Sequence, residues 1–194
     1  MNTYPPTITK EEINEMPQLS YANRRIEIVT TTEQLAAAIQ VLEQEQWVGF
    51  DTETKPSFVK GVKNKVALLQ LSTPQVCYLI RVNKLGIPPI LSTFLAAAKP
   101  LKIGLSLHDD YRVLLRSCKF KPLGFVDLQK IIKKVGIEEL GLQKMYAILF
   151  GKKISKAQRL TNWEAATLTP AQQEYAAIDA WACVDIYEKI KDEL

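Results

Sequence analysis

Trp47–Thr54 (Trp-Val-Gly-Phe-Asp-Thr-Glu-Thr) joins an apolar segment to two carboxylates that are one residue apart. The first four residues are typical of a buried strand. Side chains alternate between the faces of a strand, so Asp51 and Glu53 are expected to point to the same side. Buried like charges repel each other, and a divalent cation such as Mg²⁺ or Mn²⁺ would remove this conflict. The alternative is an exposed strand end with two solvated acids.

The composition is that of a soluble globular protein. The chain has 194 residues, 47% hydrophobic and 24% charged, which is enough for one domain with a sizeable core. We expect no membrane span and no signal peptide, because no apolar run has the length that either needs. Three scattered cysteines favour a reducing cytoplasm over a disulfide framework or a zinc site. The net charge of +4 permits a nucleic-acid partner without requiring one.

Hydrophobic periodicity predicts an α/β fold with a mixed sheet flanked by helices. We expect an N-terminal arm over residues 1–25 and a single domain over residues 26–194. A helix is predicted from Thr31 or Thr32 to about Gln46, and a long last helix is predicted to begin at Thr169-Pro170. Besides the opening stretch, the predicted strands are Ile26–Val29, Val66–Ser72, Gln75–Ile80 and Lys102–Leu105.

A metal site made of carboxylates needs further acids from separate elements. Asp109 and Asp110 follow the strand predicted at residues 102–105. Asp109 fits a helix N-cap, which leaves Asp110 free, although capping alone would also explain an acid here. On the last helix Tyr175 and Asp179 are four residues apart and share one face. Their small apolar neighbours would let this helix approach the sheet closely; the alternative is a solvated Tyr–Asp pair.

Together these motifs resemble the DEDDy-type 3′–5′ exonucleases, the family that includes RNase D and the Werner-type exonuclease domain. Phe50–Glu53 is similar to the first motif, and Gly104–Asp110 followed by Leu114 is similar to the second. Tyr175–Ala180 is similar to the third motif, whose tyrosine defines the y subclass, and Ala67–Ser72 also matches. The resemblance implies a ribonuclease H-like fold. It leaves open which of the two adjacent Asp residues acts in the second motif, although the spacing to Leu114 favours the latter one.

The resemblance also implies a mechanism that uses two divalent ions, Mg²⁺ or Mn²⁺. Asp51 would bridge both ions, Glu53 and Asp179 would hold the ion on the side of the nucleophile, and Asp110 would hold the other. Tyr175 would orient the attacking water. Nucleoside 5′-monophosphates would leave from the 3′ end of DNA or RNA. The alternative is a catalytically silent nucleic-acid-binding module on the same fold; no protein partner and no membrane contact are predicted.

Two basic loops lie beside these motifs and are expected to contact phosphates without reading sequence. The candidate residues are Lys55, Lys60, Lys63 and Lys65 in the first loop and Lys152, Lys153, Lys156 and Arg159 in the second. Phe58 is a candidate for stacking on a terminal base. The alternative for each lysine is a solvated loop charge.

Overall fold

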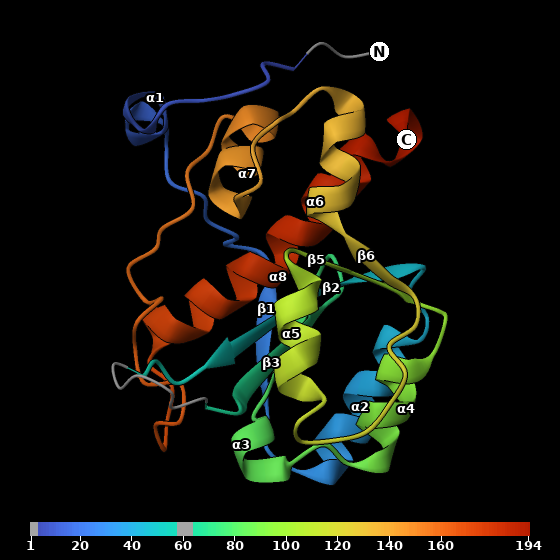
Figure 1. The fold of residues 1–194 in the computed structure, drawn as a ribbon. Helices are drawn as coiled ribbons and strands as arrows, with labels where there is room; N and C mark the ends of the chain where they lie inside the picture. The colour runs from blue at the N-terminus through green and yellow to red at the C-terminus, as the bar shows by residue number, and fades with distance from the viewer. Residues whose placement is uncertain (1–3, 58–63) are drawn as a thin grey trace.

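The computed structural model describes residues 4–57 and 64–194, which form a six-stranded sheet with helices on both faces (Figure 1). The strands lie in the order β1-β4-β3-β2-β5-β6. They are β1 (Arg25–Val29), β2 (Trp47–Thr54), β3 (Val66–Ser72), β4 (Val76–Ile80), β5 (Leu101–Gly104) and β6 (Phe125–Asp127). β3 is antiparallel to β2 and β4, and the other pairs are parallel. The predicted mixed sheet is confirmed.

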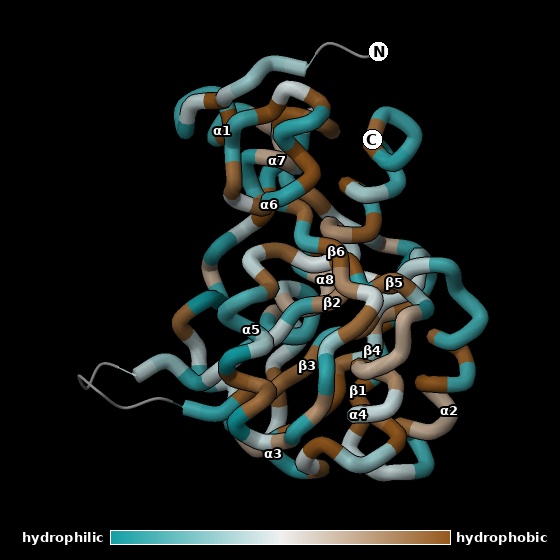
Figure 2. Tube along the Cα trace, turned by 45° about the vertical axis from the view of Figure 1, so that its right-hand side comes forward, coloured by the Kyte–Doolittle hydropathy of each residue, from teal (hydrophilic) through white to brown (hydrophobic). Residues whose placement is uncertain are grey.

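Different helices cover the two faces of the sheet. They are α1 (Lys10–Glu15), α2 (Thr32–Leu42), α3 (Val82–Leu85), α4 (Pro89–Ala96), α5 (Leu107–Leu114), α6 (Leu128–Ile131), α7 (Leu142–Phe150) and α8 (Pro170–Ile190), with 3-10 turns at Ile132–Val135 and Lys191–Glu193. Apolar side chains of α2, α4 and α5 pack on one face, and those of α7 and α8 pack on the other. The hydrophobic positions follow the strands between these layers (Figure 2). Within the described residues, no helix has the length and apolarity to cross a membrane.

Strand β2 lies inside the sheet, between β3 and β5. Val48 and Phe50 are fully buried on the face covered by α2, α4 and α5. The alternation of side chains therefore turns Asp51 and Glu53 toward the opposite face, under α8. Strand β3 supplies the neighbour, with Asp51 opposite Gln70 in the antiparallel register. The two acids thus lie on an inner strand of the sheet and are half-buried.

Helix α8 begins where the sequence predicted. Thr169 and Gln172 form a reciprocal capping box, and Pro170 occupies the first turn. Its buried face is rich in alanine, including Ala176, Ala177 and Ala180. Small side chains let the helix axis approach the sheet closely, and a side chain added at Gly49 of β2 would overlap the carbonyl group of Ala180. This contact brings the acids of β2 next to those of α8.

The N-terminal arm packs directly on the domain. α1 has a capping box formed by Thr9 and Glu12, and its Ile13 is buried with Ile8 against Ala147 of α7. Backbone hydrogen bonds hold the arm on both sides of α1: the amide of Glu138 donates to Pro6 O at 2.8 Å, and that of Leu19 donates to Lys153 O at 2.9 Å. The described part of the arm therefore has a fixed position, with α1 beside α7 (Figure 1).

One predicted helix end needs correction, and one strand was not predicted. The helix expected to reach about Gln46 ends at Leu42, because the following residues include Glu43 and Glu45, whose charge opposes the negative end of the helix dipole. Strand β6 was not predicted, because three residues are too few to show a periodic pattern. This short strand proves important for the site, since it ends in Asp127.

Candidate active site

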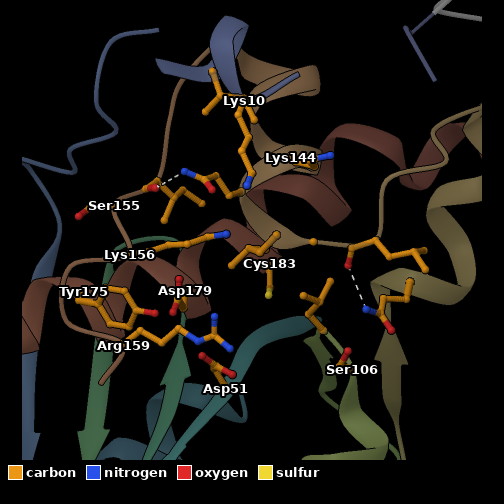
Figure 3. A pocket seen from close by; sticks show the side chains of 18 residues that line it. Lys10, Asp51, Ser106, Lys144, Ser155, Lys156, Arg159, Tyr175, Asp179 and Cys183 are labelled. Atoms are coloured by element: carbon orange, nitrogen blue, oxygen red, sulfur yellow. Dashed lines mark hydrogen bonds between the residues drawn. The ribbon is translucent and has the colours of Figure 1, made fainter. Parts of the chain in front are cut away.

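Three carboxylates meet between β2 and α8. Oxygen atoms of Asp51, Glu53 and Asp179 all lie within 4.8 Å of one another. Asp51 and Glu53 share a face of β2, and α8 places Asp179 over that face (Figure 3 shows Asp51 and Asp179). Residues 128 positions apart in the chain thus converge, as the sequence motifs predicted.

Asp110 approaches the same site from α5. Its Oδ1 accepts a hydrogen bond from the hydroxyl of Thr52, the β2 residue between Asp51 and Glu53. Its charge contributes to the raised pKa values of both Asp51 and Glu53. The side chain of Asp109, in contrast, is 81% exposed and lies 3.9 Å from Arg112. Of the two adjacent acids, Asp110 faces the site.

The expected N-cap role of Asp109 is wrong. Helix α5 begins at Leu107, with Ser106 as its N-cap. The carboxylate of Asp127, at the end of β6, accepts hydrogen bonds from the amides of Ser106 and Leu107, each at 3.2 Å. Ser106 has a φ of 54°, a left-handed conformation that residues other than glycine rarely adopt, and Asp127 holds it there. Asp127 thereby fixes the start of the helix that carries Asp110.

The four acids are half-buried and close together. Among the described residues, none of the four takes part in a salt bridge. Burial, followed by the charges of Asp179 and Asp110, raises the pKa of Glu53 to about 8. Burial also raises the pKa of Asp179 to about 7 and that of Asp110 to about 6. The pKa of Asp51 is raised well above its usual range by burial and by the three other acids.

This donor set fits divalent metal ions. Carboxylate oxygens are the ligands that Mg²⁺ and Mn²⁺ prefer. Among the described residues, the cluster formed by Asp51, Glu53 and Asp179 includes no histidine or cysteine. A cation would lower the mutual repulsion that raises the pKa values of these acids. The arrangement therefore supports dependence on a divalent metal.

Tyr175 lies one helical turn before Asp179 and points into the same space (Figure 3). Its ring packs against Trp163, with the centroids 6.0 Å apart and the planes inclined by 34°. A hydrogen bond with Tyr175 lowers the pKa of Asp179, which partly offsets the effect of burial. Burial and the charges of Asp179 and Glu53 raise the pKa of Tyr175 well above its usual range. The phenol therefore stays protonated at neutral pH and acts as a hydrogen-bonding group.

A cleft of about 460 Å³ leads away from these residues. Asp51, Asp179 and Tyr175 line one end, and Lys156 and Arg159 line it beside them. Lys156 lowers the pKa of Asp179, and Arg159 lowers that of Glu53. The cleft thus has carboxylates at one end and basic side chains beside them. This combination suits a ligand that carries both metal-binding and anionic groups.

The other predicted phosphate-binding residues lie elsewhere. Lys55 is 3.6 Å from Glu164 and lines a separate hollow beside α5. Lys65 lines another hollow, and Lys152 is exposed. Lys153 points to the arm, where its Nζ donates to Asn14 O at 2.7 Å. Three candidates lie outside the described residues: Phe58, Lys60 and Lys63.

The sequence interpretation missed three residues around the site. Asp127 stands directly before α6 and also accepts a hydrogen bond from the amide of Gln129 at 3.0 Å, so its capping position was a usable signal. Lys10 and Lys144 line the cleft from α1 and α7. No local pattern marks these two lysines, because their position depends on how the arm packs on α7.

Comparison with known proteins identifies the domain. A family model described as 3′–5′ exonuclease matches residues 26–194. The mouse bifunctional 3′–5′ exonuclease/ATP-dependent helicase WRN is 32% identical over 149 residues, which are 74% of this chain and 11% of the relative. A 3′–5′ exonuclease of Arabidopsis thaliana is 28% identical over 184 residues, 90% of this chain and 64% of the relative. The chain therefore spans less than two thirds of these relatives.

Solved structures agree on the fold. The Escherichia coli RNase D structure matches with a TM-score of 0.77 and 26% identity, over 87% of this chain and 44% of that one. The Nibbler EXO domain of Aedes aegypti matches with a TM-score of 0.77 and 24% identity, over 93% and 92% of the two chains. The expected ribonuclease H-like fold and the resemblance to RNase D and Werner-type domains are confirmed. On its fold, its acidic site and the match over residues 26–194, this chain belongs to the 3′–5′ exonuclease family.

Proposed function

We propose that this chain hydrolyses phosphodiester bonds from the 3′ end of DNA or RNA and releases nucleoside 5′-monophosphates. The observation that carries the proposal is the convergence of four half-buried acids from β2, α5 and α8 beside Tyr175 in a basic-walled cleft. Relatives named ribonuclease D and 3′–5′ exonuclease support the same activity. The site would need divalent ions to become neutral enough to accept a phosphate.

Asp51, Glu53, Asp110 and Asp179 are the residues that would hold two such ions, either Mg²⁺ or Mn²⁺. Bound there, the ions would lower the pKa of a coordinated water and offset charge on the scissile phosphate. The protein supplies the remaining parts. The protonated hydroxyl of Tyr175 orients the attacking water through a hydrogen bond, and the fixed carboxylate of Asp179 beside it limits the directions in which this hydroxyl can point.

The basic walls complete the site. Lys156 and Arg159 line the cleft beside Asp51, Asp179 and Tyr175, where their charges would attract a scissile phosphate. Such contacts to the phosphate backbone carry no sequence information. Lys55, Lys65 and Lys152, which lie apart from the cleft, would contact only a longer strand. The described contacts thus fit an enzyme that accepts many sequences.

The direct test is a degradation assay. Labelled single-stranded DNA, single-stranded RNA and a duplex with a recessed 3′ end would each be incubated with Mn²⁺ or with EDTA. We expect stepwise release of mononucleotides from the 3′ end with Mn²⁺ and none with EDTA. Asp51→Asn and Asp179→Asn should each lower kcat by about a hundredfold or more. Asp109→Asn is the matched control, because this neighbouring acid is exposed, and it should change kcat by no more than about twofold.

Two outcomes would refute the proposal. One is full activity of Asp51→Asn in a preparation free of contaminating nuclease. The other is tight binding of nucleic acid by the wild-type protein with no hydrolysis under any metal condition, which would instead support a silent binding module.

A further inference from the structure

The far wall of the cleft is built by the N-terminal arm. Lys10 and Ile13 of α1 line the same cleft as Asp51 and Asp179. In Figure 3 the side chain of Lys10 reaches down into the cleft from the side opposite Asp51, near Lys144. The arm lies before residue 26, where the match to the family model begins. This wall therefore lies outside the segment that the family model matches.

The position of Lys10 is well fixed. It is the first residue of α1, directly after the capping box at Thr9. The helix is anchored by the burial of Ile13, which is only 3% exposed. The arm is also bonded to the loop after α7, since the amide of Lys153 donates to Pro17 O at 3.0 Å. Lys10 thus projects from a supported helix and not from a loose end.

The stability of α1 does not explain a lysine at this position. A positive charge in the first turn faces the positive end of the helix dipole and is unfavourable by a few tenths of a kcal/mol. In the part of the chain that the structure describes, Lys10 takes part in no salt bridge. Its neighbour Lys144 differs, because its Nζ lies 2.8 Å from Glu139 Oε1. Lys10 therefore presents an uncompensated charge to the cleft.

We propose that Lys10 binds a backbone phosphate of the strand upstream of the scissile bond, so that the arm is part of the substrate site. The proposal rests on the proposed exonuclease function. The nucleotide removed from a 3′ end carries only the scissile phosphate. Any other phosphate in the cleft must then belong to an upstream nucleotide. Lys156 and Arg159 would contact the scissile phosphate, and Lys10 would contact a phosphate of the upstream nucleotides.

The first test measures binding. Wild-type protein, Lys10→Ala and Lys10→Glu would be titrated against labelled single-stranded RNA and DNA in EDTA, where hydrolysis does not interfere. Lys189→Ala is the matched control, because Lys189 is an exposed lysine of α8 that does not line the cleft. Lys10→Ala should weaken binding about threefold at low salt, and Lys10→Glu should weaken it further. The slope of log Kd against log salt should fall by about 0.7 for Lys10→Ala, the value for one lost phosphate contact on a single strand.

The second test uses a dinucleoside monophosphate, which has a scissile phosphate and no other. With Mn²⁺, Lys10→Ala should have the wild-type kcat/KM on this substrate. On an oligonucleotide its kcat/KM should fall about threefold, in line with the weaker binding. Equal losses on both substrates would overturn the proposal, because Lys10 would then act on the catalytic centre or on the fold. Binding of Lys10→Ala equal to that of Lys189→Ala would also overturn it.

The two proposals can fail separately. Normal hydrolysis with no effect of Lys10 rejects the role of the arm and leaves the exonuclease function standing. No hydrolysis, together with the predicted loss of binding, rejects the exonuclease function and supports the phosphate contact. No binding by the wild-type protein rejects the contact as well. Melting temperatures of the Lys10 variants should match the wild-type value, since the side chain is exposed.

Discussion

Replacement of Gly49 by alanine tests whether the close contact between β2 and α8 holds the acids together. A Cβ at this position would lie 2.8 Å from the carbonyl carbon of Ala180, and closer still to its oxygen. Ordinary contact begins only at 3.4 Å. The obstacle is backbone, so the strand and the helix must separate. Overpacking of this kind lowers the free energy of unfolding by about 1–3 kcal/mol, or roughly 2–12 °C in melting temperature for a domain of this size.

The same movement should open the active site. Asp51 is two residues after Gly49, and Asp179 is directly before Ala180. The clash therefore displaces the backbone segments that carry these two acids. A displacement of about 1 Å in a catalytic constellation is enough to reduce the rate roughly a hundredfold. We therefore expect Gly49→Ala to melt earlier and to lose most of its kcat on a labelled oligonucleotide with Mn²⁺.

The control and the refuting results are specific. Gly141→Ala serves as the melting control, because its φ is −95° and an added Cβ would meet no atom within 4 Å. It should melt within a few degrees of the wild-type protein. Wild-type stability of Gly49→Ala would show that β2 and α8 are not held this closely. Lower stability with full kcat would show that the contact does not set the spacing of the acids.

Three further predictions concern the same site. Asp127→Ala removes the acceptor at the start of α5 and should lower the free energy of unfolding by about 2 kcal/mol and kcat by about tenfold; an unchanged melting curve would contradict this. Tyr175→Phe keeps the contact with Trp163 but removes the hydroxyl, so kcat should fall about 100-fold with an unchanged melting temperature; full activity would exclude the hydroxyl from the reaction. In EDTA the melting temperature should fall as the pH rises from about 4 to 8, whereas a flat profile would contradict the raised pKa values.

The sign of this pH dependence follows from the direction of the pKa shifts. Carboxyl groups whose pKa is raised on folding hold protons that the unfolded chain has already released. The folded state is therefore favoured in acid, and this advantage is lost as the pH rises through the folded pKa values of Asp110, Asp179 and Glu53, about 6, 7 and 8. Mn²⁺ would replace these protons, so its stabilising effect should be largest at the upper end of the same range.

Much of the site could be predicted because its residues lie in strongly patterned elements. The alternation in β2 put Asp51 and Glu53 on one side, and the spacing of Tyr175 and Asp179 put them on one helix face. Convergence of the two elements followed from the resemblance to a family, since no local pattern reports a contact over such a distance in sequence.

The direction of charged loop side chains could not be predicted. Lys55 and Lys156 look alike in sequence, yet one lies beside Glu164 and the other lines the cleft. The position of Asp127 before α6 marks it as a cap, but its contact with the start of α5, 20 residues earlier in the chain, could not be predicted. Such contacts depend on how separate elements pack, and periodicity carries no information about them.

The placement of Asp179 on the last long helix has a consequence for protein synthesis. Residues 170–190 supply both an acid of the site and much of the cover for one face of the sheet. While residues 170–190 are still inside the ribosome, a nascent chain lacks Asp179 and part of its core. Domains generally fold as units. Nuclease activity would therefore arise only after residues 170–190 have left the ribosome.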